Sequence, residues 1–136
     1  MVQSLKERMK EFIKPPISQV QIVKYAGASG DYNKIHIDHA FAMNTPQKGI
    51  IAHGMLSMGF LGQYLDNIAG EEYNVKQFKV RFRGMVRPGD QLTCSAAIDK
   101  DEGDTVELEI FAKNQDGEIV TLGNATLIKT DERERN

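Results

Sequence analysis

The sequence predicts a single α+β domain in which a curved antiparallel sheet wraps around a long central helix. Two observations support this prediction. Residues 53–70 are typical of a helix that is apolar on nearly every side, and residues 75–129 contain runs in which apolar and polar side chains alternate. A helix without a polar face must be surrounded by protein, and strands joined by short turns form an antiparallel sheet with one apolar face. A sheet that curls around the helix satisfies both requirements.

The composition is typical of one globular domain, which we assign to residues 1–136. With 17 basic and 19 acidic side chains the net charge is −2, so nothing global attracts nucleic acid or an anionic membrane. The single cysteine, Cys94, excludes an internal disulfide. The sequence contains no run of about 18 apolar residues, the length needed to cross a bilayer. The charged residues 1–14 lack the apolar stretch of a signal peptide. We therefore expect a soluble, cytoplasmic protein.

A first helix is predicted after the pair Pro15-Pro16, which disfavours helix before it. Ser18 is suited to cap this helix, with Gln21 at the reciprocal position of a capping box. The helix is expected to end near Gly27. The side chains that we expect to pack on one side of it are Ile17, Val20 and Tyr25.

Four runs alternate with the period of two that half-buried strands show: residues 75–84, 91–99, 105–114 and 118–129. Turn sequences such as Arg-Pro-Gly-Asp and Asn-Gln-Asp-Gly join them. Gly123 interrupts the last run and is typical of a bulge. Residues 131–136 are expected to be unstructured. The side chains predicted to share the apolar face are Phe78, Val80, Phe82, Leu92, Cys94, Ala96, Ile98, Val106, Leu108, Ile110 and Ala112.

The central helix contains Gly59 and Gly62, each of which weakens a helix by about 1 kcal/mol relative to alanine. We expect them to be compensated by the close approach of another backbone or of a bound chain. Met43, Met55 and Met58 are predicted to lie in the core or to line a tunnel for a flexible acyl chain.

Candidate chemistry lies in residues 27–41, Gly-Ala-Ser-Gly-Asp-Tyr-Asn-Lys-Ile-His-Ile-Asp-His-Ala-Phe. The glycines favour an irregular turn over a helix, and on such a turn Asp31 and His36 could point into one cleft while Asn33 braces the loop. A carboxylate and a neutral imidazole together can hold a water molecule, remove one proton and supply another. That chemistry suits the addition of water across a double bond, or its removal.

Gly54 lies where the central helix is predicted to begin. A backbone N–H at a helix amino terminus, with no side chain in the way, is a ready donor to an oxyanion. A thioester whose carbonyl is polarised there would be electrophilic at the β-carbon if its acyl chain is unsaturated at C2–C3. If the acyl chain is saturated, the proton on the α-carbon would be acidic. This role for Gly54 is a hypothesis from spacing and residue type.

Two segments together resemble the MaoC-like family of hot-dog-fold (R)-specific enoyl-thioester hydratases and 3-hydroxyacyl-thioester dehydratases. The first runs from Tyr25 to Ala42 and the second from Gly49 to Phe60, and the later Val-Arg-Phe-Arg-Gly-Met-Val-Arg-Pro-Gly-Asp-Gln-Leu adds to the likeness. The positions that match the family's motifs are Tyr25, Ala26, Ser29, Gly30, Asp31, Asn33, Ile35, His36, His53, Gly54 and Met55. Lys34 departs from the motif, which has proline there.

The resemblance implies a lyase in which Asp31 and His36 hold the water, Asp31 takes a proton from it, and His36 handles the proton at the α-carbon. It implies that the Gly54 N–H stabilises the enolate-like oxygen, with Ser29, Gly30 and Asn33 supporting the loop. It also implies acyl groups carried by coenzyme A or acyl carrier protein, no metal or redox cofactor, a place in fatty acid metabolism, and assembly as homodimers or as pairs of unlike subunits.

Other side chains near these motifs have both a functional and a structural interpretation. His53, Met55 and Ser57 could contact substrate, or could serve the start of the helix and its core. Arg83 and Arg87, with Lys79 and Arg81, could meet the phosphates of coenzyme A, or could form a solvated strand face. His36, Asp38 and His39 invite a metal interpretation, but successive residues on an extended segment point apart, so we expect no metal, and His39 on the surface.

Two other functions remain open for this sequence. One is a thioesterase of the same fold, although such enzymes typically place a lone carboxylate on the central helix. The other is a non-catalytic subunit that binds the acyl chain and stabilises a catalytic partner, which the presence of both Asp31 and His36 disfavours.

Overall fold

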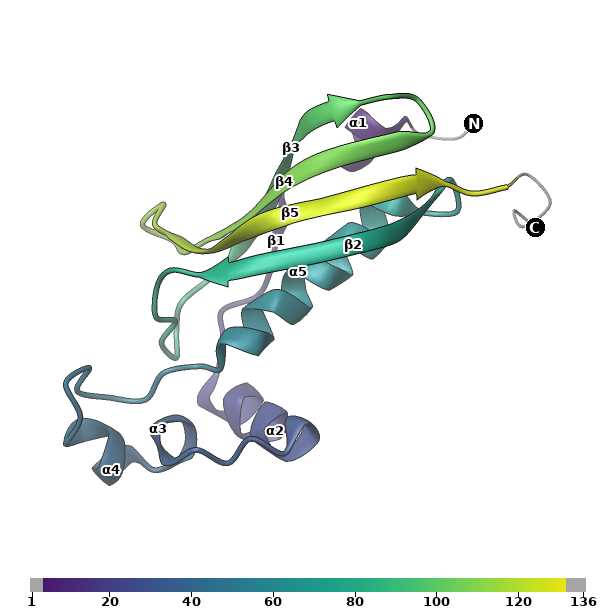
Figure 1. The fold of residues 1–136 in the computed structure, drawn as a ribbon. Helices are drawn as coiled ribbons and strands as arrows, with labels where there is room; N and C mark the ends of the chain where they lie inside the picture. Colours follow the sequence, from purple (N-terminus) through teal and green to yellow (C-terminus); the bar gives the residue numbers. More distant parts are fainter. Residues whose placement is uncertain (1–3, 132–136) are drawn as a thin grey trace.

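The computed structural model describes residues 4–131. Five helices and five strands follow one another along these residues (Figure 1). The expectation for residues 132–136 lies outside the described residues. In chain order the elements are α1 Leu5–Arg8, β1 Phe12–Ile13, α2 Gln19–Ser29, α3 Lys34–Ile37, α4 His39–Met43, α5 Gly54–Ala69, β2 Tyr73–Phe82, β3 Thr93–Asp101, β4 Thr105–Lys113 and β5 Ile119–Lys129.

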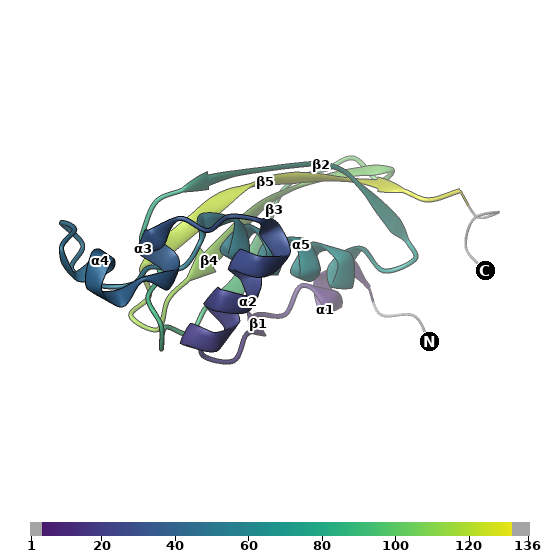
Figure 2. The ribbon, with the colours of Figure 1, turned by 90° about the horizontal axis from the view of Figure 1, so that it is seen from below.

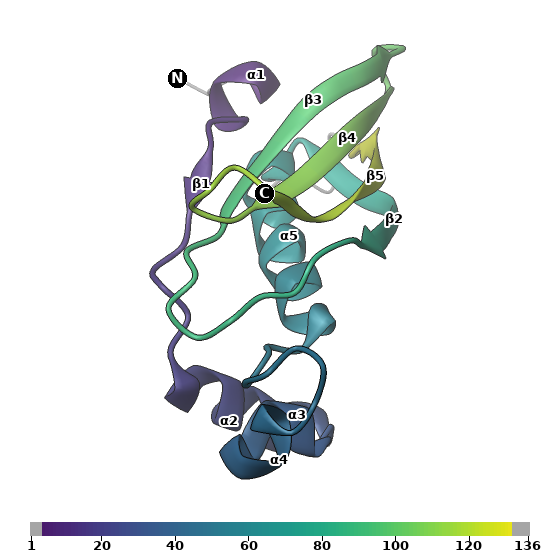
Figure 3. The same ribbon diagram turned by 90° about the vertical axis from the view of Figure 1, so that its left-hand side faces the viewer.

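The five strands form one sheet in the order β1-β3-β4-β5-β2, with every neighbouring pair antiparallel. Seen from the side, the sheet curls partly around α5, which runs along its inner face (Figure 3). The predicted α+β class, with a curved antiparallel sheet around a central helix, is confirmed. None of the helices in residues 4–131 combines the length and the apolar character that a membrane crossing requires.

The core lies between α5 and the sheet. Val106, Leu108, Ile110 and Ala112 alternate along β4 with exposed or half-exposed residues, and all four are fully buried, as their period of two predicts. From the helix, the buried side chains are Leu56, Ser57, Phe60, Leu61, Tyr64, Leu65, Ile68 and Ala69. Each large apolar side chain contributes about 1.5–3 kcal/mol by leaving water.

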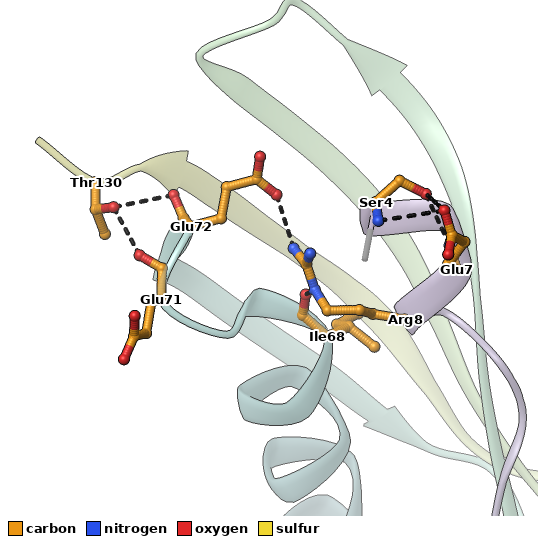
Figure 4. A network of polar contacts seen from close by, with 7 residues as sticks. All are labelled: Ser4, Glu7, Arg8, Ile68, Glu71, Glu72 and Thr130. Carbon is orange, nitrogen blue, oxygen red and sulfur yellow. Dashed lines mark hydrogen bonds and ion pairs between the residues drawn. The ribbon is translucent and has the colours of Figure 1, made fainter. Parts of the chain in front are cut away.

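The amino-terminal segment covers the opposite side of α5. Arg8 of α1 donates to the carbonyl oxygen of Ile68 at 2.7 Å and pairs with Glu72 at 2.8 Å, which anchors α1 to the end of the helix (Figure 4). The hydroxyl of Tyr64 donates to the Met9 carbonyl at 3.1 Å. The short β1 pairs with β3, so the first strand of the sheet is only two residues long.

Helices α2, α3 and α4 lie beyond the amino-terminal end of α5 (Figures 1 and 3), and from below α2 is seen in front of α5 (Figure 2). Ile22 and Ala42 join them to the same buried core as α5 and the sheet. Ser18 caps α2 by accepting from the Gln21 amide, as predicted, but α2 continues past Gly27 to Ser29. Gly30 then ends it with φ +75°, the left-handed conformation that glycine adopts without strain. The predicted packing side is wrong in part, because Val20 is 62% exposed and the buried side chains of α2 are Ile22 and Ala26.

The expectation of a bulge at Gly123 is also wrong. Gly123 forms no bulge, because it pairs in register with Val80 on one side and Ile110 on the other. Its small size instead permits the close approach of β2, since a Cβ there would overlap the Lys79 carbonyl oxygen. Within residues 4–131 no second backbone approaches Gly59 or Gly62: nothing lies within 4 Å of a Cβ at Gly59, and a Cβ at Gly62 has only an ordinary contact with the Phe78 ring. Compensation by a bound chain stays a prediction.

Candidate active site

Asp31 lies in the turn between α2 and α3, where hydrogen bonds between residues close in sequence hold the chain. Its amide donates to the Ser29 hydroxyl at 3.2 Å, and its Oδ1 accepts from the Asn33 amide at 3.2 Å. Asn33 in turn caps α3 by accepting from the Ile35 amide. Ser29, Gly30 and Asn33, which we expected to support the loop, are thus placed around Asp31. The second carboxylate oxygen of Asp31 remains outside these bonds, on a side chain that is 54% exposed.

His36 lies on α3, although a turn without helix was expected there, and its ring is buried. Its Nδ1 is 2.7 Å from the carbonyl oxygen of Ile51. Because a carbonyl oxygen can only accept, Nδ1 carries the hydrogen and the neutral ring keeps a lone pair on Nε2. That Nε2 is 4.0 Å from Asp31 Oδ2. The chain turn at residues 31–36 therefore brings Asp31 Oδ2 and His36 Nε2 to face each other.

The separation of these two atoms is suited to one shared water. A water about 2.8 Å from each of two atoms can bridge them when they are roughly 4–5 Å apart. At 4.0 Å, Asp31 Oδ2 and His36 Nε2 are close enough to share that molecule. One face of the arrangement is exposed through Asp31, while His36 is covered by protein.

His53, the residue before α5, connects this turn to the central helix. It is 2% exposed, and its Nε2 lies 3.0 Å from the main-chain carbonyl oxygen of Asp31. Its ring stacks on that of His36, with centroids 3.7 Å apart and planes 24° apart, and the ring of Tyr25 meets it edge-on at 4.8 Å. A direct contact between His53 and substrate, one of the two interpretations above, does not fit this burial.

Gly54 is the first residue of α5, as predicted, and His53 provides no side-chain cap for the helix. Among the described residues no side chain accepts from the amides of Gly54 and Met55, which leaves them to an external acceptor, whereas the Leu56 amide donates to the His53 carbonyl at 3.1 Å. A Cβ on Gly54 would lie 3.0 Å from the ring of Phe82, at the end of β2. Glycine at this position lets that ring pack directly on the start of the helix.

Asp31, His36 and His53 offer three possible metal-ligand atoms within 4.8 Å of one another. A metal ion lies close to the plane of each imidazole that binds it, and two stacked rings cannot both point their lone pairs at one ion. The Nε2 of His53 is also committed to the Asp31 carbonyl. The cluster therefore fits a metal poorly. The extended segment that was expected to separate His36, Asp38 and His39 is wrong, because residues 34–43 are largely helical.

The remaining expected side chains are more scattered. Met55 is 54% exposed and Met43 is also exposed, so neither belongs to the core, whereas Ser57 is buried in α5. Arg87 donates to the Gln47 carbonyl, and its amide donates to Asp90, so it links two loops. Arg83 is exposed just after β2, where its amide donates to the Val120 carbonyl. His39 is exposed, as expected.

The basic strand face lies on the side of the sheet turned away from α5. Lys79 and Arg81 line a hollow of about 510 Å³ there, together with the acidic Asp99 and Glu109. Mixed charge of this kind is typical of a solvated sheet face and gives no net attraction to phosphate.

Three features of the candidate site were not expected from sequence: the Ile51 carbonyl at His36, the His53 ring stacked on His36, and the Phe82 ring against Gly54. The approach of three distant segments creates them, and no local pattern records it.

The chain belongs to the MaoC-like domain family, whose pattern matches residues 2–118. Among characterised proteins it is 32% identical over 97 residues to an (R)-specific enoyl-CoA hydratase of Rhodospirillum rubrum, covering 71% of this chain and 67% of that protein. It is 26% identical over 133 residues to a 3-hydroxybutyryl-CoA dehydratase of Methylorubrum extorquens, covering 97% and 85% of the two chains. It also matches 71 residues of a fatty acid synthase subunit beta of Aspergillus oryzae at 39% identity, but spans only 4% of that protein.

The fold is also that of solved relatives. The unliganded R-hydratase PhaJ1 from Pseudomonas aeruginosa superposes with a TM-score of 0.81 and 29% identity, over 90% of this chain and 80% of that one. The (R)-hydratase from A. caviae superposes with a TM-score of 0.79 at 23% identity, over 88% and 92%, which bears on the fold alone. The hot-dog fold expected from the resemblance is thus confirmed.

Proposed function

We propose that this protein is a hydro-lyase that reversibly hydrates trans-2-enoyl thioesters to (R)-3-hydroxyacyl thioesters. The observation that carries the proposal is the facing pair Asp31 Oδ2 and His36 Nε2, 4.0 Å apart, close to the uncapped amino terminus of α5. The names of the relatives support the substrate class and the R configuration. The substrate is an acyl group carried by coenzyme A or by acyl carrier protein.

The step moves one proton from the water to C2 and forms one C–O bond. The Asp31 carboxylate accepts a proton from the water while the oxygen of that water bonds to C3 of the substrate. The electrons of the double bond pass to the thioester oxygen. The Gly54 amide stabilises that oxyanion at the helix terminus. The proton taken up by Asp31 passes to the lone pair of His36 Nε2, 4.0 Å away, and Nε2 then supplies it to C2. Asp31 is then again a carboxylate and His36 again neutral, and dehydration follows the same path in reverse.

The Ile51 carbonyl gives His36 a constant orientation during this exchange. Nδ1 donates to it at 2.7 Å whether Nε2 carries a proton or a lone pair, because only Nε2 changes. The ring therefore does not need to turn as it accepts and releases protons. This constancy is the kind of preorganisation that lowers a reaction barrier.

A second copy of the chain is part of the proposal. Asp31 is 54% exposed, and large apolar side chains near the site, such as Met55, Phe82 and Met85, are about half exposed. Exposed apolar side chains gathered near a site are typical of surfaces that a partner covers. A homodimer would shield the dyad from bulk water and enclose the acyl chain, and strand β2, at the edge of the sheet, lies where a partner would meet it.

The direct test uses crotonyl-CoA and the loss of its enoyl absorbance, with longer enoyl chains and carrier-protein thioesters in parallel. Replacing Asp31 by asparagine or His36 by glutamine should each lower kcat by about 10²–10⁴-fold, the usual contribution of a general acid or base. Asp38→Asn and His39→Gln are matched controls, because both side chains are exposed and belong to α4 or its cap. They should retain wild-type rates.

The same samples distinguish the competing functions. Release of free thiol instead of hydration would indicate a thioesterase, but the only carboxylate on α5 is Asp66, which is exposed far from the start of the helix. Light scattering in the assay buffer gives the mass of the active species. A wild-type protein inactive on every chain length and both carriers, or dyad variants as active as wild type, would refute the lyase proposal.

A further inference from the structure

His53 contacts both members of the dyad from the buried side. Its Nε2 lies 3.0 Å from the Asp31 carbonyl oxygen, and its ring stacks on that of His36 with centroids 3.7 Å apart. It directly precedes Gly54, the first residue of α5. One side chain therefore links the main chain of Asp31, the ring of His36 and the start of the central helix.

The hydrogen bond fixes the tautomer of His53. The Asp31 carbonyl oxygen can only accept, so Nε2 of His53 carries the hydrogen and Nδ1 is left with a lone pair. That Nδ1 is buried and has no hydrogen-bond partner among the described residues. A buried acceptor without a partner costs free energy, so Nδ1 by itself destabilises the fold. This cost is consistent with a function for the hydrogen bond that Nε2 donates.

We propose that His53 is a positioning residue, which holds Asp31 through its carbonyl and His36 through its ring in fixed relation to the first amide of α5. This inference rests on the proposed hydration reaction for its kinetic consequence. His53 is 2% exposed and does not itself need to touch substrate. Its loss should therefore lower kcat and leave KM almost unchanged.

Two variants separate the hydrogen bond from ring packing. His53→Gln places an amide nitrogen near the position of Nε2 and retains the donor to Asp31. His53→Phe retains the aromatic stack and removes the donor. We expect the phenylalanine variant to lose roughly 100-fold in kcat, the scale of a 1 Å misplacement of a catalytic group, and the glutamine variant to remain within about tenfold of wild type. If the phenylalanine variant does not fold, His53→Asn, whose amide is too short to reach the carbonyl, takes its place with the same expectation.

Three kinetic results would overturn the inference. Folded His53→Phe with wild-type kcat would show that the hydrogen bond positions nothing. Equal losses in the glutamine and phenylalanine variants, following their losses in thermal stability, would indicate a structural role alone. A rise in KM with constant kcat would indicate a direct contact with substrate.

A second measurement needs no activity. Nitrogen-15 NMR of the imidazoles should show a protonated Nε2 for His53 and a protonated Nδ1 for His36 at neutral pH. The carbonyl carbon signal of Asp31 should move in His53→Phe and stay near its wild-type position in His53→Gln. A protonated Nδ1 on neutral His53, or an unmoved Asp31 signal, would refute the positioning role. Wild type that lacks hydratase activity but shows these signals would refute the reaction alone.

Discussion

Asp31 and His36 are held in different ways. Asp31 is exposed, and its position depends on its main chain, which bonds to Ser29 and His53. His36 is buried, and its orientation depends on its own ring, through the Ile51 carbonyl and the stack with His53. The group proposed to accept the water proton is therefore open to solvent, while the group proposed to protonate C2 is fixed in the protein interior.

At the same scale, Gly54→Ala tests the start of α5. The added methyl group would lie 3.0 Å from the ring of Phe82, tighter than an ordinary contact. Because Phe82 is half exposed, its ring can move, so the free energy of unfolding should change by less than about 1 kcal/mol. The displaced ring should disturb the helix terminus and lower kcat by roughly ten- to a hundredfold.

Gly59→Ala is the matched control on the same helix. Among residues 4–131 nothing lies within 4 Å of its added methyl group, so it should stabilise the protein by about 0.5–1 kcal/mol and leave kcat unchanged. Urea denaturation and steady-state rates measure both variants. Equal activity in the two would contradict a special role for the first residue of α5.

At the scale of the elements, strands β2 and β5 are closely paired around Gly123. Gly123 stands opposite Val80, and β5 pairs with β2 on one side and with β4 on the other. The end of β2 brings Phe82 to Gly54, so the register of this pair also places the ring at the start of α5. An alternating pattern specifies the face of each residue, whereas the glycine permits this approach of the two backbones.

Gly123→Ala should therefore be among the most destabilising small substitutions in the sheet. Its Cβ would overlap the Lys79 carbonyl oxygen and lie 2.8 Å from the Val80 Cα, and a neighbouring backbone cannot turn aside as a side chain does. We expect a loss of about 1–3 kcal/mol or more in the free energy of unfolding, measured with urea. The exposed neighbour Asn124→Ala should change it by less than about 0.5 kcal/mol. Similar small effects in both variants would contradict the close approach.

At the scale of the whole molecule, α5 is enclosed by the sheet on one side and by residues 5–17 on another. Two titratable groups lie in this interior, Tyr64 of α5 and Cys94 of β3, each at most 1% exposed. Burial raises the pKa of Tyr64 to about 12, helped by the nearby Cys94 and Glu11. Burial also raises the pKa of the Cys94 thiol to about 11, against a smaller lowering by Lys14. Both groups are uncharged in the folded protein well into the alkaline range.

These pKa shifts predict alkaline destabilisation. Above pH 9 the unfolded chain loses the Cys94 proton, and above pH 10 it loses the Tyr64 proton, while the folded protein retains both. Their contribution to the free energy of unfolding is therefore complete below pH 9 and disappears as the pH rises towards 11 and 12. Urea denaturation of wild type, Cys94→Ala and Tyr64→Phe between pH 8 and 11 measures it. If the difference between wild type and each variant did not depend on pH, the buried thiol and phenol would have no such effect.

Much of this architecture was predictable because it depends on local periodicity. The alternation along residues 105–114 specified the buried face of β4, and Gly54 marked the start of α5. The spacing of Asp31 and His36 identified a candidate pair before any geometry was known. The packing side of α2 was not predictable in the same way, since Ile22 and Ala26 are buried by contacts that the helix itself does not specify.

The sequence alone determined the α+β class, the central helix and the residues that could handle protons, because hydrophobic period and residue type are local properties. Only the tertiary structure decided that His53 contacts Asp31 and His36, that the Ile51 carbonyl accepts from His36 and that the Phe82 ring lies against Gly54. Each of these contacts joins segments distant in the chain. Their geometry follows from the packing of the whole domain, which no short stretch of residues encodes.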